Sequence, residues 1–197
     1  MAHTARMPRA DNRLPLLLDE AARLFGERGF HGTTIRDVVR GVDMLPGSLY
    51  YHFAAKERLL AAVYTEGVRR ISARVAVAVA KRSDPWQRLT AACVAHLEAL
   101  LDEGDYAQVV IRVRPADVPE VAAELTALRD RYEALFVELI DALPLRPNVD
   151  RRHLRLMLLG ALNWSQTWYR AGRDDPRAIA RQFVALLRRP AESQGRP

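Results

Sequence analysis

Hydrophobic residues recur at helical spacing along almost the whole chain, and polar residues fill the positions between them. The first series marks one face of a helix that ends at Gly26 or Gly29 and consists of Leu14, Leu17, Leu18, Ala21, Leu24 and Phe25. Spacings of three and four residues place such positions on one side of a helix. No segment alternates with the period of two that a half-buried strand requires. The pattern therefore predicts an all-α protein.

Prolines and capping residues divide the chain into nine predicted helices. Two short helices follow the first, and a long helix begins at Lys56 and runs to about Val79. Ser83 or Asp84 is expected to cap the next helix, because serine and aspartate are favoured at helix starts. Further helices are expected from Tyr106 to about Val113, from Pro119, from Asn148 or Asp150 to near Gly172, and from Pro176 to about Arg189.

Residues 33–60 contain two short helical patterns that are too close together for anything but a tight turn. Thr33 and Thr34 are natural N-caps for the first, which is apolar at Ile35, Val38, Val39 and Val42. The second starts around Leu45 and has Pro46 in its first turn, where a missing N–H costs nothing. This arrangement is a helix-turn-helix, whose second helix can enter the DNA major groove.

The residues of this segment resemble the DNA-binding domain of TetR-type transcriptional repressors. The matching strings are Thr33-Thr34-Ile35, Val42-Asp43-Met44, Gly47-Ser48-Leu49-Tyr50, Tyr51-His52-Phe53 and Lys56-Glu57-Arg58-Leu59. Residues 21–30 are similar to the end of that family's first helix, so the resemblance covers about the first 60 residues. The family usually has Gly at Asp43 and often a polar residue at Pro46. DNA binding at that point is therefore expected to depend more on backbone and shape contacts.

The resemblance implies two domains. A flexible arm at residues 1–10 would precede a three-helix helix-turn-helix DNA-binding domain at residues 11–55. A six-helix domain for effector binding and dimerisation would occupy residues 56–189, followed by a flexible tail at residues 190–197.

Residues in and around the two short helices are expected to contact DNA. Gly47 lets the backbone approach the groove closely, and neighbouring hydroxyl and imidazole groups suit base edges or phosphates. Lys56 offers its charge and nearby backbone N–H groups at a helix start. For His52, a surface position without a role is the alternative. The full set is Thr33, Thr34, Arg36, Leu45, Pro46, Gly47, Ser48, Tyr50, Tyr51, His52 and Lys56.

The last two predicted helices have wide apolar faces, and in the TetR family this pair usually forms the dimer. The interface residues expected here are Leu158, Phe183 and Leu187. Two heads related by a two-fold axis would bind a palindromic operator in double-stranded DNA. Its half-sites would lie about 34–36 Å apart, or a multiple of that distance.

Aromatic and polar residues in the second domain indicate an effector pocket. Asn163 interrupts an apolar helix, and a buried amide needs a partner. Residues 160–164 with 168–170, and more loosely residues 107–111, resemble TetR-type regulators that sense acyl-CoA or other CoA thioesters. A position in the core or the dimer interface is the alternative. The expected pocket residues are Trp86, His96, Tyr106, Val110, Asn163, Trp164, Thr167 and Trp168.

Composition adds modest constraints. The net charge of +6 and pI near 10.0 favour a polyanionic partner, although an arginine-rich proteome explains them equally well. Cys93 is the single cysteine, which fits a reducing cytoplasm and excludes a disulfide or zinc framework within one chain. We find no secretory or membrane-spanning segment and no catalytic motif, and the histidines lack metal-ligand spacing. No enzyme activity, metal or cofactor is expected.

The sequence therefore predicts a cytoplasmic, dimeric TetR-like repressor that a small apolar effector releases from its operator. The effector would shift the long helix beginning at Lys56 and so change the separation of the two heads. An activator or a co-repressor-dependent regulator is one alternative. Another is a ligand-binding or partner-binding protein of the same fold that has lost operator recognition through Pro46.

Overall fold

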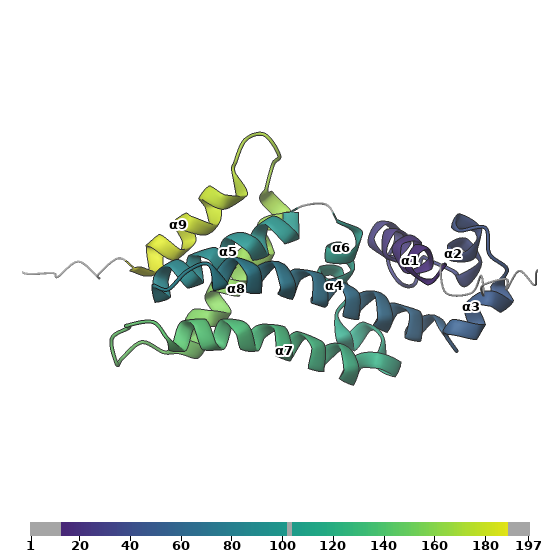
Figure 1. The fold of residues 1–197 in the computed structure, drawn as a ribbon, viewed down its shortest axis with the longest axis horizontal. Helices are drawn as coiled ribbons and strands as arrows, with labels where there is room; N and C mark the ends of the chain where they lie inside the picture. The colour runs from purple at the N-terminus through teal and green to yellow at the C-terminus, as the bar shows by residue number, and fades with distance from the viewer. Residues whose placement is uncertain (1–12, 102–103, 189–197) are drawn as a thin grey trace, which may run out of the picture.

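The computed structural model describes residues 13–101 and 104–188 (Figure 1). These residues form nine α-helices and no strand, which confirms the all-α fold class. The helices are α1 (Leu14–Arg28), α2 (Ile35–Gly41), α3 (Pro46–His52), α4 (Lys56–Ala80), α5 (Pro85–Leu101), α6 (Asp105–Arg112), α7 (Ala122–Asp141), α8 (Arg151–Trp168) and α9 (Pro176–Arg188). Two short 3-10 turns, Pro115–Asp117 and Pro119–Val121, precede α7. The arm expected at residues 1–10 and the tail at 190–197 lie outside the described residues.

Side-chain caps fix the starts of three helices. The Thr34 hydroxyl accepts a hydrogen bond from the Asp37 N–H at 3.2 Å, and the Asp37 carboxylate accepts one from the Thr34 N–H at 3.0 Å. This reciprocal capping box satisfies two N–H groups that the helix leaves unpaired. Asp84 caps α5 by accepting from the Gln87 N–H at 2.9 Å, and Asp150 caps α8 in the same way. The sequence predicted each of these caps as one of two neighbouring or nearby residues: Thr33 or Thr34, Ser83 or Asp84, and Asn148 or Asp150.

The backbone departs at two places from what the sequence or the family resemblance predicts. Asp43, in the turn between α2 and α3, has a φ of 51°, a left-handed conformation that aspartate tolerates better than most residues. This explains how the chain manages without the glycine that is usual in TetR-type proteins. The helix predicted to end near Gly172 instead ends at Trp168, because Tyr169 leaves the helical conformation with a ψ of 140°. Gly172, with a φ of 83°, serves the turn before α9.

The long helix α4 connects the two ends of the molecule. In Figure 1, α1, α2 and α3 lie around its beginning, and α5, α7, α8 and α9 surround its second half. Buried residues of α1, α2, α3, the first half of α4 and α6 form one hydrophobic cluster. A second cluster joins the end of α4 to α5, α7, α8 and α9. We call α1 to α3 the head and the remaining helices the body.

Two further features follow from the described residues. None of their helices is both long enough and apolar enough to cross a bilayer. They contain no cluster of His, Cys, Asp and Glu that could hold a metal ion. Cys93 is buried in α5, and burial raises the pKa of its thiol to about 12, so the thiol stays protonated.

Candidate DNA-binding head and effector cavity

The outer face of α3 is open to solvent. Leu49 is fully buried and anchors the helix on the rest of the head, whereas Leu45 is 76% exposed and Tyr51 is 82% exposed. His52 is half-buried, and its ring packs edge-on against Tyr51 at 5.3 Å between centroids. The other exposed residues of this face are Pro46, Gly47, Ser48 and Tyr50. The structure therefore gathers the predicted α3 contacts on one free surface, and their contact with DNA stays a prediction.

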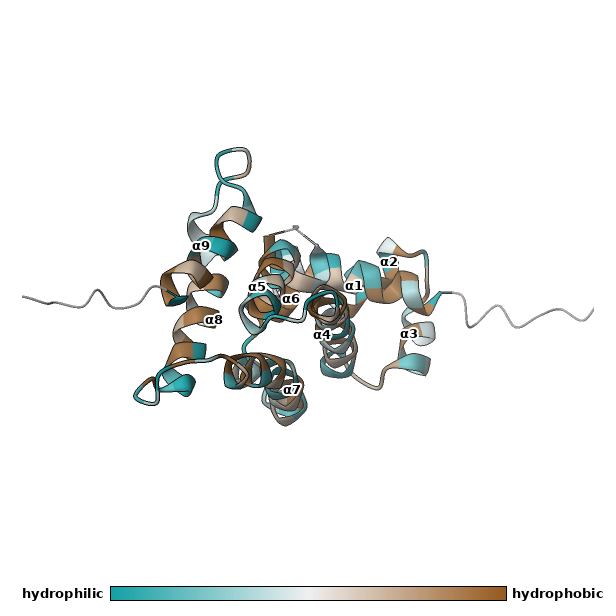
Figure 2. Ribbon diagram, turned by 60° about the vertical axis from the view of Figure 1, so that its left-hand side comes forward, coloured by the Kyte–Doolittle hydropathy of each residue, from teal (hydrophilic) through white to brown (hydrophobic). Residues whose placement is uncertain are grey.

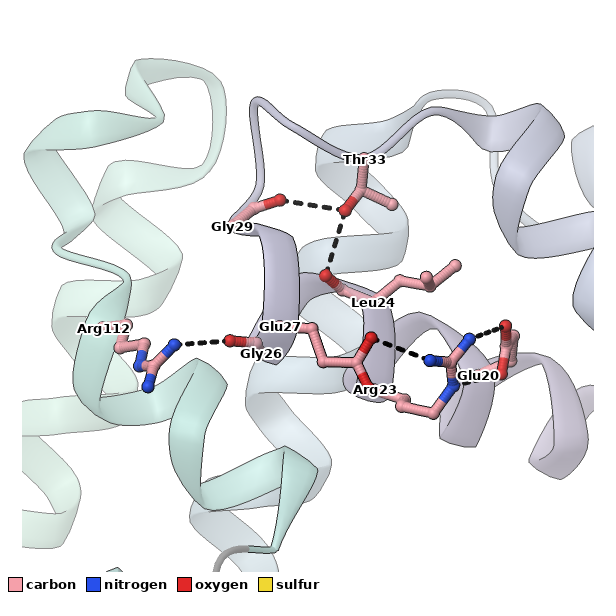
Figure 3. A network of polar contacts seen from close by, with 8 residues as sticks. All are labelled: Glu20, Arg23, Leu24, Gly26, Glu27, Gly29, Thr33 and Arg112. Atoms are coloured by element: carbon pink, nitrogen blue, oxygen red, sulfur yellow. Dashed lines mark hydrogen bonds and ion pairs between the residues drawn. The ribbon is translucent and has the colours of Figure 1, made fainter.

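Thr33 has a different role from the one predicted. Its side chain is fully buried, and its hydroxyl donates to the carbonyl oxygens of Leu24 at 3.1 Å and Gly29 at 2.9 Å (Figure 3). These bonds hold the turn between α1 and α2. The prediction that Thr33 contacts DNA was wrong, because its polar atom faces the protein interior. Of its neighbours, Arg36 is exposed, and Thr34 is exposed but uses its hydroxyl as the cap of α2.

The Lys56 side chain mainly stabilises the fold. Its ammonium donates to the carbonyl oxygens of Phe30 and Thr33, both at 3.0 Å, and lies 4.1 Å from the centroid of the Phe30 ring. A lysine ammonium has three N–H donors, so two are used here to hold the start of α4 against the turn between α1 and α2. A phosphate contact through the third donor stays a prediction.

Helix α6 joins the head to the body through polar contacts. The Arg112 guanidinium donates to the Gly26 carbonyl oxygen near the end of α1 at 2.7 Å (Figure 3). The Tyr106 hydroxyl donates to the Asp19 carboxylate at 2.8 Å, and the Arg70 guanidinium lies 4.0 Å from the Tyr106 ring centroid. Burial and the Asp19 contact raise the pKa of Tyr106, so its hydroxyl remains a donor. We call these contacts, together with Gly67, the head joint.

Gly67 lets α4 and α6 approach closely. A Cβ atom at this position would lie 2.7 Å from Val110 Cγ2 and 2.9 Å from the Tyr106 carbonyl oxygen. No side chain fits there without moving the backbone of α6. The two helices are therefore in direct backbone contact at the head joint.

A cavity of about 280 Å³ lies in the body, where α4, α5, α6, α7 and α8 meet. Its wall is mainly apolar or aromatic and is built from Tyr64, Val68, Ile71, His96, Leu100, Val110, Ile111, Val113, Arg114, Arg129, Tyr132, Glu133, Gly160, Asn163, Trp164 and Gln166. A larger groove, about 840 Å³, runs over Ala73 and Val77 of α4 but is open to solvent. The smaller cavity is less open to solvent and is therefore the better candidate for an effector site.

Half of the predicted pocket residues line this cavity, namely His96, Val110, Asn163 and Trp164. The other four do not line it. Trp86 packs among α5 and α9 beside Arg188, and Tyr106 belongs to the head joint. Thr167 and Trp168 lie one turn beyond Asn163 and Trp164 at the end of α8, where both are exposed.

A chain of hydrogen bonds crosses the cavity wall. His96 Nε2 lies 2.9 Å from the Asn163 amide oxygen, and His96 Nδ1 lies 2.6 Å from the Tyr132 hydroxyl. The amide oxygen can only accept, so Nε2 carries the proton and Nδ1 accepts from Tyr132. Burial lowers the pKa of His96 to about 4, which keeps the ring neutral near pH 7. His96 thus bonds the Asn163 amide, although Asn163 is exposed and not buried as the sequence predicted.

Two tyrosines of the cavity wall, Tyr64 and Tyr132, were not predicted as pocket residues. Tyr64 is fully buried, and burial raises its pKa to about 12. Tyr64 and Tyr132 both lie on the apolar faces of their helices, where periodicity indicates only a core position. The hydroxyl at the end of each ring is the one signal in the sequence that could have distinguished them.

An exposed apolar stripe runs along α8 and continues onto α9. Its members are Leu156, Met157, Trp164 and Trp168 on α8, and Leu186 on α9. Figure 2 shows hydrophobic segments on these two helices at the end of the molecule away from α3. Of the predicted interface residues, Phe183 and Leu187 are half-buried beside this stripe. Leu158 is 2% exposed and packs in its own core, so the prediction that it contacts a partner was wrong.

Comparison with known families decides the broad identity. Residues 17–63 match the family of bacterial regulatory proteins called tetR, and residues 82–190 match the tetracyclin repressor-like C-terminal domain. The chain belongs to the TetR family. It is thus a helix-turn-helix transcriptional repressor with a DNA-binding head and a ligand-binding body, as the sequence predicted.

Several known proteins are similar to this chain over most of their length. The HTH-type transcriptional repressor KstR2 of Mycobacterium tuberculosis is 30% identical over 179 residues, which cover 87% of this chain and 88% of KstR2. The regulator PfmR of Thermus thermophilus is 25% identical, with a TM-score of 0.71 over 87% of this chain and 96% of PfmR. AibR without ligand is 27% identical, with a TM-score of 0.72 over 89% of this chain and 97% of AibR. AibR in complex with isovaleryl coenzyme A and operator DNA has a TM-score of 0.78 at 24% identity, over 88% of this chain and 97% of AibR, a likeness of fold alone.

Proposed function

We propose that this TetR-family repressor acts as a homodimer and leaves a palindromic operator when a small apolar effector occupies the cavity. The observation that carries the proposal is the position of α6. Val110 and Ile111 of this helix line the cavity, while Arg112 and Tyr106 contact α1 of the head. A ligand that moves α6 therefore acts directly on the head.

The operator side of the proposal is supported by the surface of the head. The exposed face of α3 contains side chains with polar end groups and a glycine, and it carries no acidic residue. Arg36 and Arg40 are exposed on the neighbouring α2, where positive charge suits phosphates. The stripe on α8 and α9 supports a dimer, because a large exposed apolar surface marks an interaction site. Two heads in one dimer would contact two half-sites of a palindrome.

The effector side is supported by the size and lining of the cavity. A volume of about 280 Å³ is at the small end for ligand pockets and suits an acyl-sized or compact ring-sized apolar group. An acyl-CoA or another CoA thioester fits if the acyl group enters and the nucleotide remains outside. Asn163 and Trp164, from the segment that resembles thioester-sensing regulators, lie on the wall. Isovaleryl coenzyme A is the ligand of the AibR complex, which makes it a rational first probe.

The proposed mechanism needs only a modest coupling. Effector and DNA would prefer different positions of α4 and α6, and so different separations of the two heads. A coupling free energy of about 1–3 kcal/mol between the two sites changes operator affinity by roughly 5- to 150-fold.

The test begins with a footprint of the full-length protein on the DNA that flanks its own gene. A protected palindrome is expected. Fluorescence anisotropy on that operator then follows release by a panel of CoA thioesters and free apolar acids. A protein that gives no footprint on any flanking DNA would support the alternative function without operator recognition. Release by an unrelated ligand alone would refute the thioester while leaving the repressor intact.

Trp164→Ala separates the pocket from the dimer interface. Trp164 lines the cavity and is also 67% exposed within the stripe on α8. We expect the variant to remain dimeric in sedimentation and to bind the operator normally, with a weaker response to ligand. A monomeric variant would place Trp164 in the interface instead.

A further inference from the structure

The cavity wall contains one buried polar group that makes no hydrogen bond within the described residues. The hydroxyl of Tyr64, on α4, is buried and makes no hydrogen bond to any described residue. The remaining polar side chains around the cavity are mostly satisfied: His96 bonds Tyr132 and Asn163, and Glu133 pairs with Arg155. A buried donor without a partner is unfavourable, so its retention calls for an explanation.

The groups that remain available in the cavity are hydrogen-bond donors. The raised pKa of Tyr64 keeps its hydroxyl protonated. The Asn163 oxygen is occupied by His96, and the amide N–H groups of Asn163, an exposed residue at the edge of the cavity, remain available as donors. The rest of the wall includes the apolar residues Val68, Ile71 and Leu100 as well as the charged or polar residues Arg114, Arg129, Glu133 and Gln166. Such a site favours an apolar molecule that brings an acceptor.

We propose that the cavity selects an apolar effector that carries a carbonyl oxygen, and that this oxygen accepts a hydrogen bond from the Tyr64 hydroxyl. The inference rests on the proposed function and adds the chemistry that the effector must have. Arg129 also lines the cavity, and its charge opposes the rise in the pKa of Tyr64, so a positive charge lies near the proposed oxygen. Ketones and thioesters both supply the required oxygen.

Tyr64→Phe tests whether the hydroxyl is unpaired in the free protein. Removal of an unsatisfied buried hydroxyl without a change of ring shape should raise the Tm by roughly 2–4 °C. Tyr106→Phe is the matched control, because the Tyr106 hydroxyl is bonded to Asp19 and its loss should lower the Tm. A Tyr64→Phe protein that melts below the wild type would show that the hydroxyl is already paired and would overturn the proposal.

Calorimetric titration of the full-length protein with two matched probe pairs tests the carbonyl. The pairs are isovaleryl coenzyme A with its thioether analogue, and 1-decalone with decalin. Wild type should bind at least one carbonyl member about tenfold more tightly than its partner, and Tyr64→Phe should abolish that ratio. Discrimination that survives in Tyr64→Phe, or no binding of either carbonyl probe to wild type, would overturn the proposal. The pair that shows the effect distinguishes a thioester from a ketone.

Operator release by the same probes separates this inference from the proposed function. If a carbonyl probe binds through Tyr64 but leaves the operator complex intact, release by effector fails and the carbonyl site stands. If the thioether or the hydrocarbon releases the operator as well as its carbonyl partner does, the carbonyl site fails and the repressor function stands.

Discussion

The two faces of α6 differ sharply in how they are packed. Toward the head, Tyr106 and Arg112 are hydrogen-bonded to α1. Next to these contacts, Gly67 of α4 brings the backbones of α4 and α6 together. Toward the body, Val110 and Ile111 border a cavity of about 280 Å³. Close-packed regions transmit displacement, whereas a cavity can change its contents at small cost to the rest of the fold. The comparison suggests that a ligand acts on the compliant face and that the stiff face conveys the movement.

Gly67→Ala gives the largest expected effect, on the stiff face. The added Cβ would meet both Val110 Cγ2 and the Tyr106 carbonyl oxygen below 3.0 Å, so α6 must move. We expect a loss of about 1–3 kcal/mol in the free energy of unfolding, measured by urea denaturation. Adding Val110→Ala should recover part of this loss, since one of the two clashing atoms is removed. A Gly67→Ala protein as stable as wild type would mean that the joint is loose.

The second-largest expected effect is a pH dependence of stability that arises from the buried His96 beside the cavity. Its pKa falls from 6.5 to about 4 on folding, because burial disfavours the charged ring, so the unfolded chain binds the proton more readily. The contribution of the neutral ring to the free energy of unfolding is fully present above about pH 6.5, and it declines as the pH falls toward 4. At about pH 5 the expected loss is about 2 kcal/mol. The difference between wild type and His96→Gln across this range isolates the effect, and parallel pH profiles would contradict it.

Arg112→Gln gives the smallest expected effect and tests the polar part of the head joint. The variant loses the hydrogen bond to the Gly26 carbonyl oxygen, at a cost of about 1 kcal/mol in urea denaturation. Arg114→Gln is the control, because among the described residues Arg114 pairs only with Asp117, three residues away, and not with the head, a contact of at most about 0.5 kcal/mol. Equal losses in the free energy of unfolding for the two substitutions would show that the contact between Arg112 and the head does not stabilise the protein specifically.

The sequence was most informative where the relevant residues are neighbours along the chain. Caps such as Thr34, Asp84 and Asp150 and the prolines at helix starts allowed most helix bounds to be predicted closely. The exposed face of α3 could also be predicted, because it comes from one short helix whose inner side is marked by Leu49.

The cavity was harder to predict, since its wall comes from five helices. Helical spacing shows which residues share a face but not which neighbour that face meets. Tyr64 and Tyr106 both lie on apolar faces, yet one is unpaired at the cavity and the other bonds Asp19, 87 positions away. Thr33 was misjudged, and the structural role of Lys56 was missed, for a similar reason: both side chains bond backbone carbonyl oxygens that helical spacing does not reveal.

The most direct test of the link between cavity and head needs no ligand. Ile111→Trp places a large side chain into the cavity from α6, while Val77→Trp adds the same group on the exposed outer face of α4, outside the cavity. Operator affinity would be measured by fluorescence anisotropy, with Tm and sedimentation as checks of fold and dimer. We predict that Ile111→Trp weakens operator binding at least about fivefold, the lower end of allosteric coupling, and that Val77→Trp has no effect. A folded, dimeric Ile111→Trp protein with wild-type operator affinity would contradict the account.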